Sequence, residues 1–300
     1  MSELTKSLVA AGVSKSYGQK QVLSGLDLTL EPGRIYGLVG RNGAGKTTLL
    51  SILTAQAPLN GGSVTYGGEP VWENPRALAD ICFSRELSPT LGSSQNTMKI
   101  RDYLEAAALF FPRWDAAYAA RLLAEFGLER KKKICKLSKG MMSMVTIVIA
   151  LASRAPFTIL DEPVAGLDVV ARERFYQLLL EDYTETGRTF VVSTHIIEEA
   201  ASVFEEVIFL DDGKVLEKAP TDELLAQFHT VSGLADVVDA ACAGLQVLGC
   251  EQLGRQKQCV VRCGAGALQR AVQGRDVDVA PMSLQKVFVT LCGHTEKGAL

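Results

Sequence analysis

One eight-residue segment constrains this chain more than any other. Residues 40–47 read Gly-Arg-Asn-Gly-Ala-Gly-Lys-Thr, which fits G-x-x-x-x-G-K-[ST] without a mismatch. A short apolar run at 35–39 precedes the segment, and a helical pattern follows over 46–54. The glycines allow backbone N–H groups to turn inward, and the helix N-terminus adds partial positive charge. The segment therefore predicts a phosphate-binding loop between a strand and a helix.

Each position of this loop has an expected task. Lys46 is expected to neutralise the outer phosphates, and the Thr47 hydroxyl to ligate Mg²⁺. Thr48 is expected to help hold a phosphate. The remaining phosphate contacts are expected from the loop itself, that is from Gly40, Asn42, Gly43, Ala44 and Gly45.

A second apolar run ends in two carboxylates. Residues 157–162 read Phe-Thr-Ile-Leu-Asp-Glu, and Asp161 lies 115 residues after Lys46 of the loop. At the carboxyl end of a parallel strand such groups face the ligand crevice. We expect Asp161 to orient Mg²⁺ through its water shell, and Glu162 to position an attacking water and accept its proton. A strand end with two solvated acids is the simpler alternative, but the phosphate loop upstream favours the functional interpretation.

The hydrophobic pattern predicts alternating strands and helices interrupted by a helical insert. We expect strands at 8–13, 22–30, 35–39, 157–160, 189–193 and 207–210, and helices at 46–54, 100–111, 118–126, 170–180 and 197–203. Residues 90–155 are predicted to be mostly helical. A domain boundary is expected near 228, followed by a small α+β appendage over 229–300 with a hairpin around Gly254 and a helix at 283–291.

Four further motifs complete a family resemblance. Residues 137–141 read Leu-Ser-Lys-Gly-Met, 164–168 read Val-Ala-Gly-Leu-Asp, 193–195 read Ser-Thr-His and 16–18 read Ser-Tyr-Gly. Together with the loop and the carboxylates, they resemble the signature, D-loop, switch histidine and adenine-stacking loop of ABC transporter ATP-binding subunits. The resemblance covers roughly 8–225. It implies a P-loop NTPase fold over 1–228, with a mainly parallel sheet, an antiparallel β subdomain and a helical subdomain at about 90–155.

The resemblance implies a head-to-tail dimer that holds two ATP molecules with Mg²⁺. Ser138 and Gly140 of one chain are then expected to face the phosphate loop of the other. His195 is expected to sense the γ-phosphate and hold it against Glu162 and the water. Tyr17 is expected to stack on adenine, although a plain surface aromatic is an alternative.

Three residues depart from the family pattern. Lys139 replaces the first of two signature glycines, and Met141 replaces the terminal glutamine. Glu86 stands where the family has the Gln of its glutamine loop, and a glutamate there can still ligate Mg²⁺. Gln95 is the alternative if the register slips. The segment 86–104 is the expected contact surface for a permease.

Composition narrows the class of partner. The 31 basic and 34 acidic side chains give a net charge of −3, which does not favour nucleic-acid binding. Residues 130–133 form a basic run, which we interpret as a solvated turn. The N-terminus does not resemble a targeting peptide, and the longest apolar stretch of interest, 144–152, is far below the about 20 residues of a membrane span. Any transport role therefore requires a separate membrane permease, with this chain on the cytoplasmic face.

The seven cysteines form no CxxC pair, and we expect reduced thiols. Cys259 and Cys263 are interpreted as small buried apolar residues rather than zinc ligands, because no histidine lies at metal-site spacing.

The combined reading predicts a Mg²⁺-dependent ATPase, homodimeric or heterodimeric, that energises a separate permease. The single cassette and its extension resemble bacterial exporter subunits. The alternative is a non-transport ATPase acting on ribosomes or DNA, against which one cassette and the lack of sustained heptads argue. A regulatory protein without turnover is disfavoured by the presence of Glu162 and His195.

Overall fold

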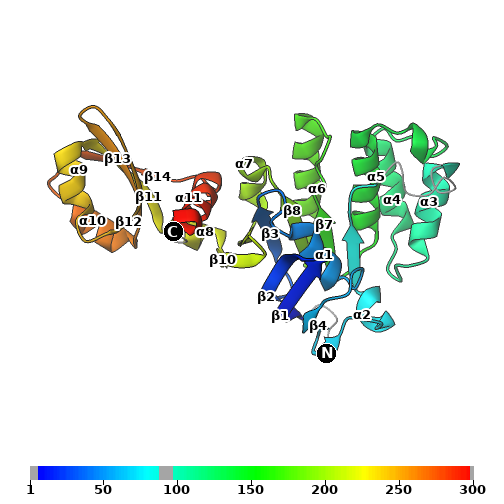
Figure 1. Cartoon of the computed structure of the whole chain (residues 1–300). Helices are drawn as coiled ribbons and strands as arrows, with labels where there is room; N and C mark the ends of the chain where they lie inside the picture. Colours follow the sequence, from blue (N-terminus) through cyan, green and yellow to red (C-terminus); the bar gives the residue numbers. More distant parts are fainter. Residues whose placement is uncertain (1–5, 88–96, 298–300) are drawn as a thin grey trace. The chain divides into compact units, whose positions relative to one another are not determined.

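A computed structural model describes residues 6–87 and 97–297 of the chain. The chain divides into two compact units, Met1–Glu217 and Lys218–Leu300. Figure 1 shows both units in one drawing, coloured along the sequence. The boundary expected near 228 lies within the second unit.

A six-stranded sheet forms the centre of the first unit. Its order is β10-β9-β3-β8-β7-β6. The strands are β3 (Ile35–Gly40), β6 (Ile81–Ser84), β7 (Phe157–Asp161), β8 (Thr189–Thr194), β9 (Glu206–Asp211) and β10 (Lys214–Pro220). The neighbours from β9 to β6 run parallel, so their carboxyl ends meet at one edge. Every residue of β3, β7 and β8 is buried, as expected for strands covered on both faces.

An antiparallel sheet lies beside the central one and shares its core. Its order is β2-β1-β4-β5, with β1 (Leu8–Tyr17), β2 (Lys20–Leu30), β4 (Gly61–Tyr66) and β5 (Glu69–Pro70). Leu28 and Leu30 pack in one cluster with Leu49 and Leu50 of α1 (Lys46–Leu53). This packing fixes the helix that follows the phosphate loop.

Helices make up much of the described part of the segment between the sheet strands β6 and β7. They are α3 (Ile100–Ala108), α4 (Ala116–Glu125) and α5 (Lys139–Ala152), with a 3₁₀ turn η3 (Ile134–Lys136). The helices predicted at 100–111 and 118–126 are confirmed. Figure 1 shows the three helices side by side. Further helical elements among the described residues of this unit are α2 (Pro75–Ala79), α6 (Val169–Thr186), α7 (Ile197–Ala200) and the 3₁₀ turn η4 (Ala201–Val203).

The second unit is an α+β fold with its own core, as predicted. Its elements are α8 (Thr221–Leu225), β11 (Phe228–Leu234), α9 (Ala235–Cys242), β12 (Gln246–Leu253), β13 (Gln256–Arg262), α10 (Ala265–Val272), β14 (Val277–Pro281) and α11 (Leu284–Lys297). The sheet order is β12-β13-β11-β14, and all its pairs are antiparallel. Val231, Val238 and Val261 are fully buried in this core.

The expectation that all cysteines are reduced is wrong for one pair. Cys250 and Cys259 form a disulfide, because they lie directly opposite each other on β12 and β13. Cys259 is buried as predicted, and Cys263 is partly buried. No group of three or more His, Cys, Asp or Glu side chains forms a metal cluster in the described part of the chain.

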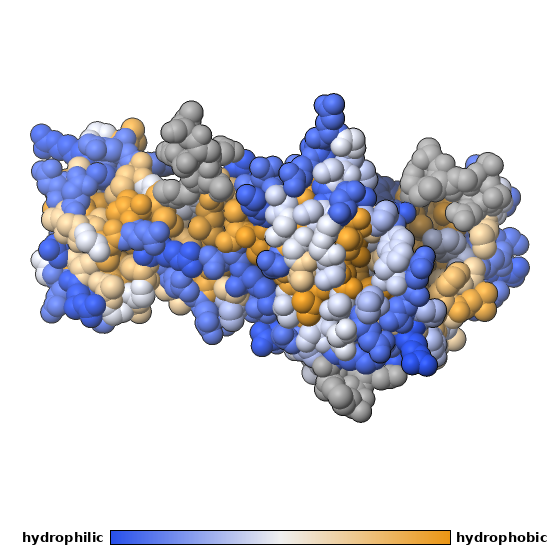
Figure 2. All heavy atoms as spheres, turned by 60° about the horizontal axis from the view of Figure 1, so that its bottom comes forward, coloured by the Kyte–Doolittle hydropathy of each residue, from blue (hydrophilic) through white to orange (hydrophobic). Residues whose placement is uncertain are grey.

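The surface mixes hydrophilic and apolar residues, as Figure 2 shows for one face. Within residues 6–87 and 97–297, no helix has the length and apolar character that a membrane span requires.

Candidate active site

The phosphate loop connects the end of β3 to the start of α1. Gly45 lies at the helix N-cap with φ 104°, in the region that favours glycine, and no side chain caps the helix. The first N–H groups of α1 thus remain free of a side-chain cap. Lys46 is 7% exposed, and its Nζ donates to the carbonyl oxygen of Gly40 at 2.7 Å. The lysine ammonium is therefore held by backbone carbonyl oxygens of the loop.

Two hard oxygen ligands meet at the carboxyl edge of the sheet. Thr47 Oγ1 donates to Asp161 Oδ2 at 2.6 Å, although the two residues are 114 positions apart. Mg²⁺ is usually bound through one or two protein oxygens, with phosphate oxygens and water completing an octahedron. The pair fits that donor set.

Ser193 connects the carboxylate of Asp161 to the backbone of Glu162, and sequence reasoning assigned it no role. It faces Asp161 in the parallel register of β7 and β8. Its buried hydroxyl donates to Asp161 Oδ1 at 2.5 Å and accepts the N–H of Glu162 at 3.0 Å. The sequence signal that could have identified Ser193 is its position near the end of an apolar strand, two residues before His195. Ser193 thus orients Asp161 and the backbone of Glu162.

Glu162 is held from both sides. Its Oε2 lies 2.7 Å from His195 Nδ1, and its Oε1 lies 3.6 Å from Lys46 Nζ. Its backbone has φ 49°, which is unusual for a residue with a side chain. Strained backbone of this kind is concentrated at functional sites. The structure therefore brings together the three residues predicted to be catalytic, Lys46, Glu162 and His195.

The signature lies at the N-terminus of α5. Ser138 caps that helix, because its Oγ accepts the N–H of Met141 at 3.2 Å. A Cβ on Gly140 would lie 2.6 Å from the carbonyl oxygen of Gly166 in the D-loop. Lys139 instead extends its side chain to solvent, 56% exposed. This explains how the chain can carry a lysine at the first signature position and still require glycine at the second.

Glu86 contacts the signature rather than the pair of oxygen ligands. Its Oε1 lies 3.2 Å from Lys139 Nζ, and the glutamate side chain is 47% exposed. Two of the departures from the family pattern therefore pair with each other. The alternative residue, Gln95, lies outside the described residues.

Tyr17 ends β1 and is 54% exposed. Lys15 Nζ lies 4.9 Å from the ring centroid. The ring is accessible to a stacking partner, but its contact with adenine remains a prediction.

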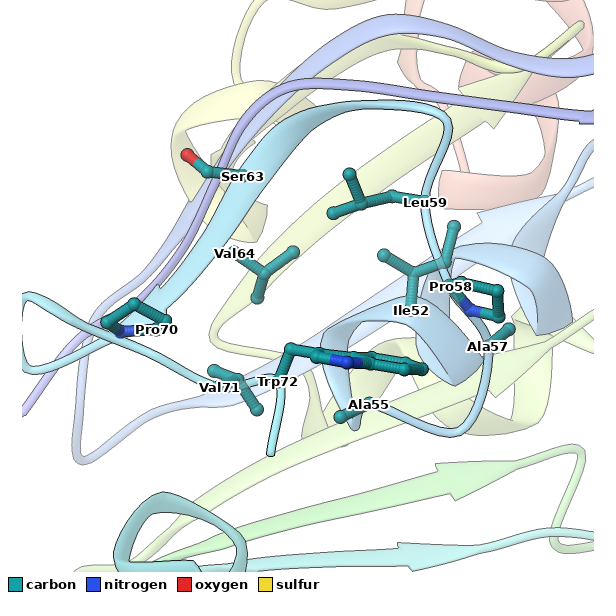
Figure 3. A pocket seen from close by; sticks show the side chains of 10 residues that line it. All are labelled: Ile52, Ala55, Ala57, Pro58, Leu59, Ser63, Val64, Pro70, Val71 and Trp72. Carbon is teal, nitrogen blue, oxygen red and sulfur yellow. The ribbon is translucent and has the colours of Figure 1, made fainter. Parts of the chain in front are cut away.

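An apolar pocket of about 330 Å³ lies at the far end of α1 and is distinct from the phosphate loop. Figure 3 shows Ile52, Val71 and Trp72 lining it. No charged side chain lines the pocket, so its chemistry does not suit a triphosphate.

Comparisons with known proteins agree with this geometry. The family model described as ABC transporter matches residues 23–165. The taurine import ATP-binding protein TauB of Escherichia coli is 35% identical, over 68% of this chain and 80% of TauB. The Nod factor export ATP-binding protein I of Cupriavidus pinatubonensis is 31% identical, over 97% of this chain and 92% of the relative. A solved ATP-binding subunit of an ABC transporter superposes with a TM-score of 0.63 at 25% identity, over 72% of this chain and 91% of that one.

Proposed function

Because this chain belongs to the ATP-binding subunits of ABC transporters, we propose that two copies of it close around ATP and thereby drive a separate membrane permease. Members of this family bind ATP with Mg²⁺ and hydrolyse it. The observation that carries the proposal is the joint placement of Lys46, Thr47, Asp161, Glu162 and His195 at one sheet edge.

The chain's own residues divide the work as follows. The loop N–H groups and Lys46 bind the phosphates, and Thr47 with Asp161 holds Mg²⁺, which supplies charge neutralisation on the phosphate oxygens. Glu162 orients the attacking water and accepts its proton as the new O–P bond forms and the bond to the leaving phosphate breaks. His195 fixes the Glu162 carboxylate through the 2.7 Å contact. Lys46 must leave Gly40 and Glu162 for the phosphates, which frees one carboxylate oxygen of Glu162.

The second half of the site comes from the other copy. Ser138 and Gly140 lie at the start of α5, where the helix N-terminus presents backbone N–H groups and Ser138 is the N-cap. One chain carries both halves, which supports a pair of identical chains. ATP drives closure only if it binds the closed pair better than the open one.

We propose export as the direction. The relative that spans nearly the whole chain, second unit included, is named for Nod factor export. The taurine import protein matches 68% of this chain. On this proposal the chain lies at the cytoplasmic face of the membrane, and the segment 86–104 faces the permease; residues 88–96 of that segment lie outside the described ones.

The test is purification of the tagged chain from native membranes, with its bound partners identified. Recovery of a protein with several membrane spans supports the proposal, whereas recovery of ribosomes or nucleic acid without one contradicts it. Direction is then measured by reconstituting the complex in vesicles with this chain outside and ATP added outside. Export predicts substrate accumulation in the vesicle lumen, and import predicts its loss from the lumen.

A further inference from the structure

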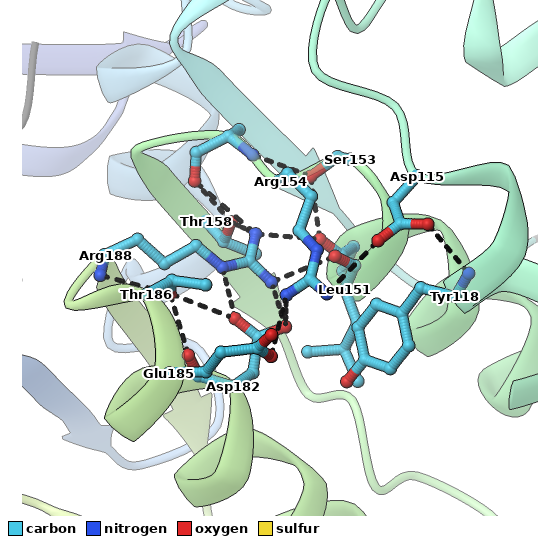
Figure 4. Close-up of polar contacts among 12 residues, drawn as sticks. Asp115, Tyr118, Leu151, Ser153, Arg154, Thr158, Asp182, Glu185, Thr186 and Arg188 are labelled. Atoms are coloured by element: carbon cyan, nitrogen blue, oxygen red, sulfur yellow. Dashed lines mark hydrogen bonds and ion pairs between the residues drawn. The ribbon is translucent and has the colours of Figure 1, made fainter.

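A buried cluster of charged side chains lies at the opposite end of β7 and β8 from the catalytic groups. Arg188 precedes β8, and its side chain is 2% exposed. It pairs with Asp182 of α6, whose side chain is 0% exposed. Figure 4 shows the two side chains together with Arg154. Nothing in the catalytic chemistry described above uses this cluster.

The Arg188 guanidinium is fully engaged. Nε and Nη2 donate to the two carboxylate oxygens of Asp182 at 2.6 and 2.8 Å. Nη1 donates to Thr158 Oγ1 at 3.0 Å, and Nη2 donates to the carbonyl oxygen of Leu151 at 3.0 Å. Removing two charges from water is expensive, and such a pair is stable only when its remaining donors are satisfied. This pair meets that condition through backbone and hydroxyl acceptors of the signature helix and its neighbours.

Two of the carbonyl acceptors belong to the last turn of α5. Arg188 donates to the carbonyl oxygen of Leu151 at 3.0 Å and to that of Ala150 at 3.4 Å. The helix end itself supplies Arg154 N–H to the Leu151 oxygen and Ser153 Oγ to the Ala150 oxygen. A cation at this end also interacts favourably with the helix dipole. Helix α5, which carries the signature in its first turn, is therefore held at its last turn by hydrogen bonds from Arg188.

Arg154 connects this cluster to α4 through ion pairs. It follows α5 with φ 50°, and its guanidinium bridges Asp182 Oδ2 at 3.0 Å and Asp115 Oδ2 at 3.3 Å. Asp115 caps α4 by accepting the N–H of Tyr118 at 2.8 Å, and Arg154 also lies over the Tyr118 ring. One carboxylate of α6 thus holds the end of α5 and, through Arg154, the start of α4.

We infer that this Arg188–Asp182–Arg154 cluster positions the signature by fixing the angle of α5 against the central sheet. This inference rests on the proposed function, in which the signature must meet ATP on a second copy of the chain. At 1.5 Å per residue the 14-residue helix is about 21 Å long, so a tilt of about 10° at its last turn moves the signature by about 3.6 Å. Displacements of that size break hydrogen bonds to a phosphate. Arg188, Asp182 and Arg154 are positioning residues, because they act only through α5 and α4.

The experiment compares Glu162→Gln, which should accumulate the ATP-bound pair, with Glu162→Gln/Arg188→Lys. Lysine keeps the charge but lacks the fork that reaches both Asp182 and the α5 carbonyls. A fluorescent ATP analogue reports nucleotide affinity, and analytical ultracentrifugation reports pairing. We expect affinity to change by less than about twofold, because the phosphate loop is remote. ATP-dependent pairing should fall by at least about tenfold, and turnover in an Arg188→Lys chain by up to about 100-fold.

Two variants separate positioning from general destabilisation. Leu8→Ala opens a cavity in the antiparallel sheet, where Leu8 is fully buried, and should lower the melting temperature without weakening pairing. Arg154→Gln leaves the buried pair intact and should weaken pairing in the same direction but less, which keeps the test decisive if Arg188→Lys does not fold.

Each outcome is decisive. Unchanged pairing in the Arg188→Lys and Arg154→Gln chains overturns the inference. The inference is also overturned if Leu8→Ala loses as much ATP-dependent pairing as Arg188→Lys. Lower stability alone would then explain the loss of pairing. If Glu162→Gln itself does not pair with ATP, the proposed function fails, and the inference fails with it.

Discussion

Lys46 has three partners in this structure: the carbonyl oxygens of Gly40 and Arg41 and the carboxylate of Glu162. It is also nearly buried, at 7% exposure. A buried ammonium held by weak partners is suited to bind a stronger anion, because its charge is already partly removed from water.

Replacing Lys46 by alanine should therefore abolish most nucleotide binding. We expect Lys46→Ala to raise the Kd for ATP by about 100-fold or more, since a charge-assisted contact and the shape of the loop are lost together. Isothermal titration calorimetry measures the change. Lys20→Ala removes an exposed lysine at the start of β2 and should leave the Kd unaltered; equal Kd values for both variants would remove Lys46 from the site.

Glu86 offers a test of two competing roles. If its main partner is Lys139, Glu86→Gln should change the free energy of unfolding by only about 0–1 kcal/mol, because both groups are roughly half exposed. The Mg²⁺ concentration for half-maximal ATPase activity should then stay constant. A clear rise in that concentration would instead show that Glu86 ligates the metal during turnover.

At the scale of single elements, Ser138 combines two tasks that a substitution can separate. Ser138→Asp keeps a good N-cap for α5, whereas Ser138→Ala loses the cap and about 1 kcal/mol of stability. On the proposed function, aspartate places a negative charge against the γ-phosphate. The more stable variant, Ser138→Asp, should therefore show the lower turnover. Chemical denaturation measures the stability of the two variants, and steady-state ATPase rates measure their turnover. The prediction is refuted if the more stable variant also has the higher turnover.

The N-cap of α4 should give the first unit an acid-sensitive contact. The N–H of Tyr118, and secondarily Arg154, hold the pKa of Asp115 below its ordinary value. A depressed pKa stabilises the fold above the unfolded pKa of about 3.9 and loses that contribution as pH falls through the folded pKa. Asp115→Asn keeps the cap but not the charge. We expect it to be up to about 1 kcal/mol less stable than the parent at pH 7, with the gap closing below about pH 4 in urea titrations.

The elements that the sequence predicted well are those with a local physical signal. The phosphate loop, the buried strands of the central sheet and helices α3 and α4 follow from glycine spacing and apolar periodicity. Strands β4, β11 and β14 were missed. The short strands β4 and β14 include exposed residues, and β11 contributes buried residues but does not alternate between apolar and polar residues.

Contacts between elements that are distant in the sequence were harder to predict than the elements themselves. From the sequence alone, Arg188 before β8 cannot be distinguished from an exposed charged turn residue. Its partner, Asp182, lies on another element, α6. The pairing of Cys250 with Cys259 was within reach, since both are equidistant from the turn of the predicted hairpin around Gly254. Ser193 required the register of β8 against β7, which no single strand reveals.

At the scale of the whole molecule, the cysteines report on both units. Five cysteines are free, and of these Cys135 is exposed while burial raises the pKa of the Cys82 thiol to about 11. We expect Cys135 to react first with a thiol reagent in the folded protein, five thiols to react after unfolding, and all seven only after reduction. Seven reactive thiols without a reductant would contradict the Cys250–Cys259 pair.

The order of strands in the central sheet determines how long β3 waits for its neighbouring strands during synthesis. Strand β3, which leads into the phosphate loop, ends at residue 40, but one of its two neighbours ends at residue 211, so 211 − 40 = 171 residues must follow before that neighbour is complete. At roughly 5–20 residues per second, an apolar strand waits about 10–35 s for its partners during synthesis. The second unit is made after the first and can keep the first unit tethered to the ribosome while that unit folds. Substitutions that slow folding of β8 or β9 should therefore reduce yield in cells more than they reduce the stability of the purified protein.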